Sequence, residues 1–363
     1  MENNRKNKLI CILFALFFAF GFFLCVLLPK KEYSYSERRK LAQLPKCSKE
    51  TLWNGTFMSG FDKYSQDQFP FREDFRRLKA LTATKVFGRK DNHGIYVTDG
   101  FAAAMEYPMK EKHMEQAAQR FRYLYETYLT EENSVFFSVI PDKNCFLAEE
   151  SGHLSMDYDA FEKTMAKKID FAEYIQISDL LDRNDYYKTD THWRQEQITD
   201  VADCLASAMG TTSIQDYEKK TVEQDFYGVY AGQSALPLKP DSLCYLTNDT
   251  LEQCKVYDYQ NNRPGFVYDF QRASGKDPYE LFLSGPISLI TMENPTAENS
   301  RELILFRDSF GSSIAPLLLD GYSKITLVDI RYIHPDLLGK FVDFRGCDVL
   351  FLYSSLVLNT FSF

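Results

Sequence analysis

The chain is poor in the residues that several functional classes require. Its 363 residues include five histidines and two tryptophans, and its eight cysteines form no CxxC pair and no Cys/His spacing typical of zinc sites. Aspartate and glutamate outnumber lysine and arginine by 51 to 42, which gives a net charge of −9. A nucleic-acid-binding surface needs a basic field to neutralise phosphates, so no nucleic-acid partner is expected.

One long run lacks charge altogether. Residues 9–28, "LICILFALFFAFGFFLCVLL", are apolar or small and long enough to cross a bilayer as a helix. The following "PKKEYSYSERR" offers no small-residue cleavage site. We therefore expect an uncleaved transmembrane anchor rather than a signal peptide.

Basic residues flank this run on both sides, so the positive-inside rule does not decide the orientation. A single N-terminal anchor followed by a long acidic domain is the usual arrangement of a protein whose body is exported. We therefore expect residues 1–8 to lie in the cytoplasm. The main domain is expected outside the cell membrane, which makes the chain a single-pass membrane protein.

Two of the eight cysteines lie in the apolar run. Of the other six, Cys244 and Cys254 are spaced so that a disulfide between them would close a short loop, and buried free thiols are the alternative.

The rest of the chain has two patterns. Residues 29–85 predict a stalk and an N-terminal helical segment, with two amphipathic helices broken near Pro70. From residue 86 to 363, continuous apolar runs alternate with helix-like segments. Four runs predict buried strands: "SVFFSVI", "RELILF", "KITLVDI" and "DVLFLY". Such runs spaced by helices predict one α/β domain with a mostly parallel central sheet and helices on both faces. An earlier stretch, "NHGIYVTDGFA", predicts a hairpin that turns at Asp99 and Gly100.

Two stretches carry candidate chemistry. "TDTHW" places Asp190 and His192 two positions apart, so that an extended segment would point both side chains the same way. "RDSFG" places Ser309 in a predicted strand-to-helix turn, at the sheet edge where catalytic groups collect. A serine becomes nucleophilic beside a base, and a histidine serves best when a carboxylate fixes its tautomer. Together the stretches predict a Ser-His-Asp triad.

Both stretches have other interpretations. Ser309 alone is also typical of a helix N-cap. Asp190 and His192, with Asp185, are acceptable ligands for zinc or manganese, although no further cluster at ligand spacing supports a metal site. We expect neither a metal nor another cofactor.

The chain resembles the DHHW proteins of bacteria, which are similar to alginate O-acetylation proteins and to the wider group of SGNH-hydrolase-like acetyltransferases. The resemblance extends over nearly the whole predicted exported part. It rests on these segments, in this order: "SYSERRKLAQLP", "FDKYSQDQFPFRED", "NHGIYVTDG", "VIPDK", "TDTHW", "DFYGVY", "LFRDSFGSSIAPLL" and "LVDIRY". Thr191 departs from the family motif, which has histidine at that position.

The resemblance implies an SGNH-hydrolase-like α/β sandwich in which Asp190 orients the base His192 and Ser309 is the nucleophile. It implies O-acetyl transfer to a cell-surface or exported polysaccharide, with the acetyl donor supplied by a membrane-bound O-acyltransferase. Two alternatives remain open. One is a carbohydrate acetylesterase with the same triad, and the other is a non-catalytic protein that binds glycans or assembles an export machine.

Supporting roles are assigned by position along the chain. The Ser309 amide and the Gly285 amide are candidate oxyanion donors, with an ordinary turn as the alternative for Gly285. Arg331 and Lys143 follow predicted strands and are candidates for substrate binding, with solvated charges as the alternative. Two further residues are expected to support the site structurally, namely Trp193 as a packing anchor and Asp308 in the nucleophile turn.

Overall fold

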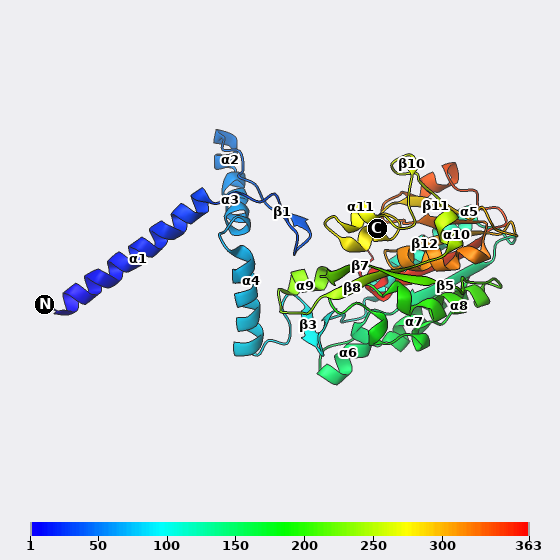
Figure 1. Cartoon of the computed structure of the whole chain (residues 1–363), viewed down its shortest axis with the longest axis horizontal. Helices are drawn as coiled ribbons and strands as arrows, with labels where there is room; N and C mark the ends of the chain where they lie inside the picture. Colours follow the sequence, from blue (N-terminus) through cyan, green and yellow to red (C-terminus); the bar gives the residue numbers. More distant parts are fainter. Residues whose placement is uncertain (1, 362–363) are drawn as a thin grey trace. The chain divides into compact units, whose positions relative to one another are not determined.

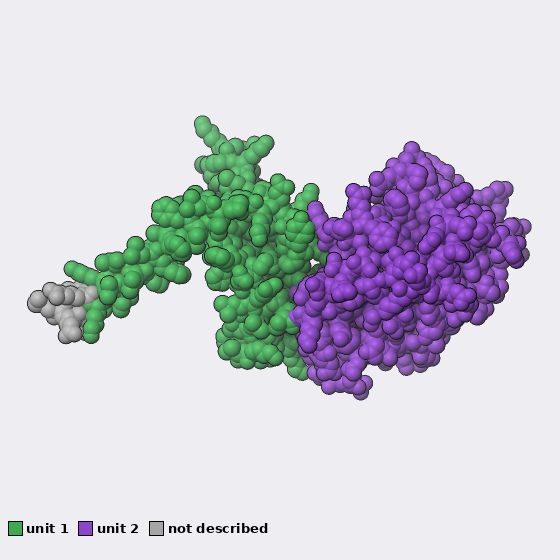
Figure 2. All heavy atoms as spheres, in the orientation of Figure 1, with its two compact units in different colours: residues 1–92, 232–237 green, residues 93–231, 238–363 purple. Residues whose placement is uncertain are grey.

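The computed structural model describes residues 2–361, so Met1, Ser362 and Phe363, which belong to the predicted first and last segments, lie outside the described residues. The chain forms two compact units, shown in Figure 2. One comprises residues 1–92 with 232–237, and the other comprises residues 93–231 with 238–363. The boundary falls a few residues after the predicted boundary at residue 86.

The first unit begins with one long apolar helix, α1 (Glu2–Leu27). Within residues 2–361 it is the only helix that is long and apolar enough to cross a membrane, over Lys6–Leu27. Its apolar side chains are almost all exposed in the isolated chain. These properties suit a single-pass anchor or a signal sequence.

The remainder of the first unit is a small set of helices and a short ribbon. The ribbon pairs β1 (Tyr33–Ser34) with β2 (Arg39–Lys40). Three helices follow: α2 (Lys49–Trp53), α3 (Thr56–Asp67) and α4 (Arg72–Leu81), with a π-helical turn at Thr82–Val86. The predicted break near Pro70 is present between α3 and α4, since proline lacks the amide that a continuous helix would need.

An eight-stranded sheet organises the second unit (Figure 1). Five neighbouring strands run parallel, in the order β13 (Lys324–Val328), β12 (Glu302–Arg307), β14 (Asp348–Ser354), β5 (Val135–Ile140) and β6 (Glu173–Tyr174). The sheet continues beyond β13 by antiparallel pairing through β11 (Leu289–Glu293), β9 (Lys255–Asp258) and β10 (Arg263–Pro264). The prediction of a mostly parallel sheet is confirmed.

The central strands bury both faces, as their uninterrupted apolar sequences predict. Along β12, Leu303 and Leu305 belong to one hydrophobic cluster, whereas Ile304 and Phe306 belong to another. Helix α8 (Thr199–Ala208) contributes to the first cluster. Helices α5 (Glu111–Tyr128) and α7 (Tyr158–Lys168) contribute to the second. The result is the predicted α/β sandwich.

Several smaller elements complete this unit. The predicted hairpin is present as β3 (Ile95–Thr98) and β4 (Phe101–Ala104), with positive φ at Asp99 and Gly100. A second ribbon pairs β7 (Glu218–Phe226) with β8 (Asp241–Thr247). The short helices are α6 (Asn144–Ser151), α9 (Val229–Ser234), α10 (Asp249–Gln253), α11 (Phe270–Ala273), α12 (Gly311–Ile314) and α13 (Ser355–Thr360).

Two segments with helix-like patterns are more tightly wound than expected. The segment after Ser309 has one α-helical turn and then a 3-10 helix at Ala315–Gly321, and the segment after β13 forms a 3-10 helix at Pro335–Lys340. Proline stands at the start of each 3-10 helix. Because proline lacks an amide hydrogen, it fits the first turn of a helix and not its continuation.

Candidate active site

Asp190, His192 and Ser309 form one hydrogen-bonded chain in the second unit. His192 Nδ1 lies 2.6 Å from Asp190 Oδ1, and His192 Nε2 lies 2.8 Å from Ser309 Oγ. Asp190 is fully buried and His192 nearly so, whereas Ser309 is partly exposed. A buried acid and base behind an accessible hydroxyl is the arrangement that acyl transfer through serine requires.

The backbone around Asp190 is a tight bend rather than the extended strand expected from the sequence. Asp190 Oδ1 accepts the backbone amide of His192 at 3.2 Å as well as its ring nitrogen. Asp190 Oδ2 accepts the amide of Val229 at 2.8 Å. The two side chains therefore meet through a local side-chain-to-backbone turn, and the carboxylate is held at both oxygens.

The Val229 amide reaches Asp190 because the preceding residue has no side chain. A Cβ placed on Gly228 would lie 2.3 Å from Asp190 Cβ and 2.5 Å from its backbone nitrogen. The Gly228 amide donates to Thr189 Oγ1 at 2.9 Å, which ties the two backbones together. The "DFYGVY" segment thus supports the acid through a close backbone approach that only glycine permits.

A buried lysine also stabilises the backbone bend at Asp190. Lys143, at the end of the loop after β5, donates from Nζ to the carbonyl oxygens of Tyr187 and Asp190 at 2.6 Å each and to that of Lys188 at 3.3 Å. Its side chain is 1% exposed, and burial lowers the pKa of Lys143 to about 7. This position differs from the expected substrate-binding role, because the ammonium group faces backbone carbonyls.

Aromatic side chains fix the plane of the His192 ring. Tyr279 stacks on it with ring centroids 3.7 Å apart and an interplanar angle of 6°, and Phe310 lies at 4.9 Å. The Tyr279 hydroxyl is 2.9 Å from Ser313 Oγ, which accepts Trp193 Nε1 at 2.8 Å. Trp193 is fully buried against the nucleophile turn, as a packing anchor would be. No sequence pattern singled out Tyr279, because it lies in a short 3-10 helix, Pro278–Leu281, far along the chain from His192.

Asp308 anchors the turn that carries Ser309. Its Oδ1 accepts the Phe310 amide at 3.0 Å. Its Oδ2 accepts the amide and the hydroxyl of Ser354, at the end of β14, at 2.8 and 2.6 Å. Asp308 therefore joins the carboxyl ends of β12 and β14, as its expected structural role requires.

The two candidate oxyanion donors differ in their surroundings. In the nucleophile turn, the amides from Phe310 to Ser313 all donate to acceptors between Asp308 and Phe310. The Ser309 amide has no hydrogen bond of this kind among the described residues. The Gly285 amide instead donates to the Phe282 carbonyl, and Gly285 has φ of 82°. This geometry favours the alternative interpretation of Gly285 as an ordinary turn glycine.

Arg331 is part of an ion-pair network at the carboxyl ends of β12 and β13. It forms a two-pronged pair with Asp329, at 2.8 and 2.6 Å, and these contacts raise the pKa of Arg331. Arg307, fully buried, lies 3.8 Å from the same carboxylate. Arg331 is partly exposed, and its contact with substrate stays a prediction.

The metal interpretation gains no support from the described residues. They contain no group of three or more His, Cys, Asp or Glu side chains placed to hold an ion. Both ring nitrogens of His192 are engaged, one with Asp190 and one with Ser309.

The structure has no disulfide between Cys244 and Cys254. All eight cysteines are free thiols.

The second unit is an α/β sandwich with a mostly parallel central sheet that carries a hydrogen-bonded Asp-His-Ser chain. Its fold is similar to that of a DHHW family protein from Eubacterium siraeum, at 19% identity and a TM-score of 0.57, over 73% of this chain and 91% of that one. It is also similar to PatB1 from Bacillus cereus, solved with a sulfonyl adduct, at 18% identity and a TM-score of 0.58, over 74% and 98% of the two chains. The predicted similarity to DHHW proteins is confirmed at the level of the fold.

Sequence comparison alone finds no relative: no family model and no curated protein matches the chain.

Proposed function

We propose that this protein is a membrane-anchored, extracytoplasmic O-acetyltransferase that modifies a cell-surface or exported polysaccharide. The observation that carries the proposal is the hydrogen-bonded chain from Asp190 through His192 to the partly exposed Ser309. Each member has the residue type and the distance that acyl transfer needs. The sulfonyl adduct of PatB1 adds support, since sulfonyl groups are captured by nucleophilic side chains.

The proposed reaction has two halves. In the first, His192 Nε2 takes the proton of Ser309 Oγ as the oxygen attacks the acetyl carbonyl, and the protonated ring then gives this proton to the leaving oxygen. In the second half, His192 removes the proton of a sugar hydroxyl as the sugar oxygen attacks acetyl-Ser309, and the protonated ring returns this proton to Ser309 Oγ as the serine leaves. Asp190 stabilises the charged ring in both halves, and the Ser309 amide is the proposed oxyanion donor.

The proposed surroundings follow from α1 and from the resemblance to DHHW proteins. An anchor at Lys6–Leu27 would hold the second unit close to the membrane. A membrane-bound O-acyltransferase would supply acetyl groups at that surface. The acceptor is proposed to be a polysaccharide, reached through the exposed side of Ser309.

An acetylesterase is the second candidate, because the same three residues can pass the acetyl group to water. The full chain in detergent would be incubated with a small acetyl ester, with and without an acetyl-free polysaccharide. We expect faster consumption of the ester with polysaccharide and acetate esters on the sugar. Equal rates with no acetylated sugar would favour the esterase.

Two variants separate both enzymes from a non-catalytic protein. Ser309→Ala is expected to abolish turnover, whereas Ser312→Ala, a matched removal of a buried hydroxyl in the same turn, is expected to retain it. If wild type and Ser309→Ala consume the ester equally slowly, the glycan-binding or export-assembly alternative takes precedence.

A further inference from the structure

The first unit exposes an apolar surface that its own fold does not cover. We call this surface the α4 face. It is made of Phe71, Phe75, Leu78, Val86 and Phe87. These side chains are 60%, 53%, 59%, 72% and 74% exposed, respectively. Large apolar side chains this exposed, and this close together in sequence, are typical of an interaction surface rather than of a solvated helix.

The α4 face is regular. Phe75, Leu78 and Thr82 follow one another at steps of three and four residues, so they lie along one side of α4 and its π-helical extension. Phe71, the residue before α4, lines a hollow together with Phe75 and Leu78. The side that packs inward is small, since Ala80 and Ala83 are its buried residues. The amphipathic pattern in this helix therefore points most of its apolar residues away from the unit.

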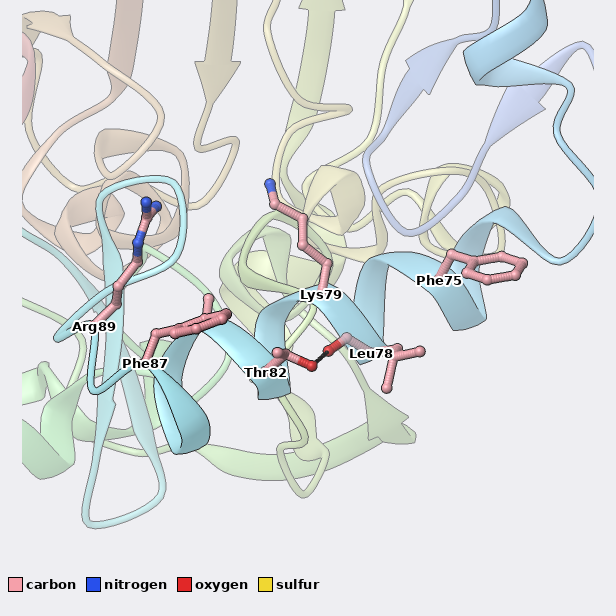
Figure 3. Close-up of a pocket in the computed structure, with 7 residues that line it drawn as sticks. Phe75, Leu78, Lys79, Thr82, Phe87 and Arg89 are labelled. Carbon is pink, nitrogen blue, oxygen red and sulfur yellow. Dashed lines mark hydrogen bonds between the residues drawn. The ribbon is translucent and has the colours of Figure 1, made fainter.

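A pocket of about 720 Å³ lies on the α4 face, as Figure 3 shows. Phe75, Leu78 and Phe87 line it together with Lys79 and Arg89. In Figure 3 the aromatic rings of Phe75 and Phe87 lie at opposite ends of the pocket. A pocket with an apolar floor and cations at its border suits a ligand that carries both hydrocarbon and negative charge.

The charge of this segment opposes that of the whole chain. Residues 69–90 contain seven lysines and arginines and two acidic residues, in a chain whose net charge is −9. Arg72 and Arg76 pair with Glu73 and with Glu37, so their charge is neutralised within the unit. The second acid, Asp74, lies beside Phe71, Phe75 and Leu78. The other lysines and arginines leave a positive surplus, and two of them, Lys79 and Arg89, line the pocket with Phe75, Leu78 and Phe87.

We propose that the α4 face lies on the anionic lipid surface of the membrane that holds α1. This inference rests on the proposed membrane anchor. Exposed aromatic and aliphatic side chains would enter the interface between headgroups and acyl chains, and the flanking cations would bind lipid phosphates. A protein partner would match the apolar residues equally well, but the surplus of positive charge favours anionic lipid. The face would fix the first unit on the bilayer, in addition to the tether through α1.

The test places a fluorescent reporter on the face in the full chain. Phe75→Trp is made in a chain whose Trp53 is replaced by phenylalanine, because Trp53 is 95% exposed in the same unit. The protein is reconstituted into vesicles of phosphatidylcholine, with or without phosphatidylglycerol, that contain brominated lipid. We expect quenching of the new tryptophan, and roughly twofold or greater quenching when phosphatidylglycerol is present. Phe270→Trp is the matched control, because Phe270 is an exposed phenylalanine of the second unit, 51% exposed, and should not be quenched.

Three results would overturn the inference. Quenching of Phe75→Trp no greater than that of Phe270→Trp would show that the face does not reach lipid. Equal quenching in both lipid mixtures, or no loss of quenching in the Lys79→Glu and Arg89→Glu double variant, would remove the role of charge. Flotation of wild type with vesicles is measured in parallel: flotation without quenching rejects only the α4 face, whereas no flotation rejects the anchor as well.

Discussion

At the scale of single residues, the central feature is that each nitrogen of His192 has its own partner. Asp190 holds Nδ1 while Nε2 faces Ser309 Oγ. A carboxylate at Nδ1 favours the tautomer whose Nε2 accepts a proton. The oxygens of Asp190 also accept two backbone amides, from His192 and Val229, so its position does not depend on the ring alone.

Asp190→Asn tests this tautomer control. The asparagine side chain keeps the size of the aspartate. With its NH2 group turned toward Nδ1 of His192, it would favour the tautomer that carries its proton on Nε2, and a ring in that tautomer cannot act as the base. We expect kcat for the acetyl ester to fall by about 10³ to 10⁴, with a small change in KM. Steady-state kinetics measures both. A fall of less than about tenfold would contradict the role of Asp190.

Lys143 gives a pH-dependent prediction. In the folded chain its pKa is lowered to about 7 by burial, whereas the unfolded chain keeps the ordinary value near 10.5. Between these values the unfolded chain binds more protons, so this lysine should make the free energy of unfolding rise with pH, by at most about 1.4 kcal/mol per pH unit. The contribution is largest above the unfolded pKa and is lost as pH falls to 7.

Lys143→Met removes this titrating group, so the difference in unfolding free energy between wild type and variant should grow in favour of wild type from pH 7 to pH 9.5. Denaturant titrations at several pH values measure it. Lys188→Met, an exposed lysine beside the same bend, is the control and should leave the profile unchanged. A pH-independent difference for Lys143→Met would show that the lysine stays charged throughout.

The sequence predicted the three central residues but not what holds them. Asp190, His192 and Ser309 stand out because the chain has few histidines and because serine follows an apolar strand. Tyr279 contacts His192 from a short 3-10 helix, and Gly228 contacts Asp190 from the segment after β7. Such short segments carry no periodic signal. Lys143 was singled out, but its burial depends on the packing of the bend, which one sequence does not reveal.

At the scale of elements, the site depends on the approach of the segment after β7 to the bend at Asp190. Gly228→Ala would place a methyl group 2.3 Å from Asp190 Cβ. One backbone must then move, and the Val229 hydrogen bond to Asp190 would be lost. We expect kcat to fall at least about tenfold, because misplacement by a fraction of an ångström weakens catalysis steeply.

The control for this change is Gly339→Ala, whose new methyl would meet only the ring of Tyr128, at 3.0 Å. Both variants are compared by ester turnover and by thermal unfolding. A Gly228→Ala protein with wild-type turnover would show that the close approach does not position Asp190. Equal loss of turnover in both variants would point to a general loss of stability.

Strands could be predicted from the sequence where they form long apolar runs. The buried strands β5, β12, β13 and β14 read as continuous apolar runs. The antiparallel extension through β9, β10 and β11 was not predicted, because these strands have only two to five residues each and include polar positions, so they lack a long apolar run. The 3-10 segments after β12 and β13 share the apolar spacing of α-helices, so the pattern did not distinguish them.

At the scale of the whole molecule, the chain joins an apolar N-terminal helix to an α/β sandwich that carries the proposed chemistry. Fold similarity covers about three quarters of the chain, at identities of 19% and 18%. At such distances the fold is shared, whereas the activity rests on the site of this chain. The proposal therefore depends on whether Ser309 takes up an acyl group.

The most direct test is to look for that acyl group. The full chain in detergent is mixed with an acetyl ester, quenched in acid within seconds, and digested for mass spectrometry. The account predicts acetyl on the Ser309 peptide of wild type, none in Ser309→Ala, and strongly reduced labelling in His192→Ala. Absence of acetyl-Ser309 from a wild type that still consumes the ester, or equal labelling of wild type and His192→Ala, would contradict it.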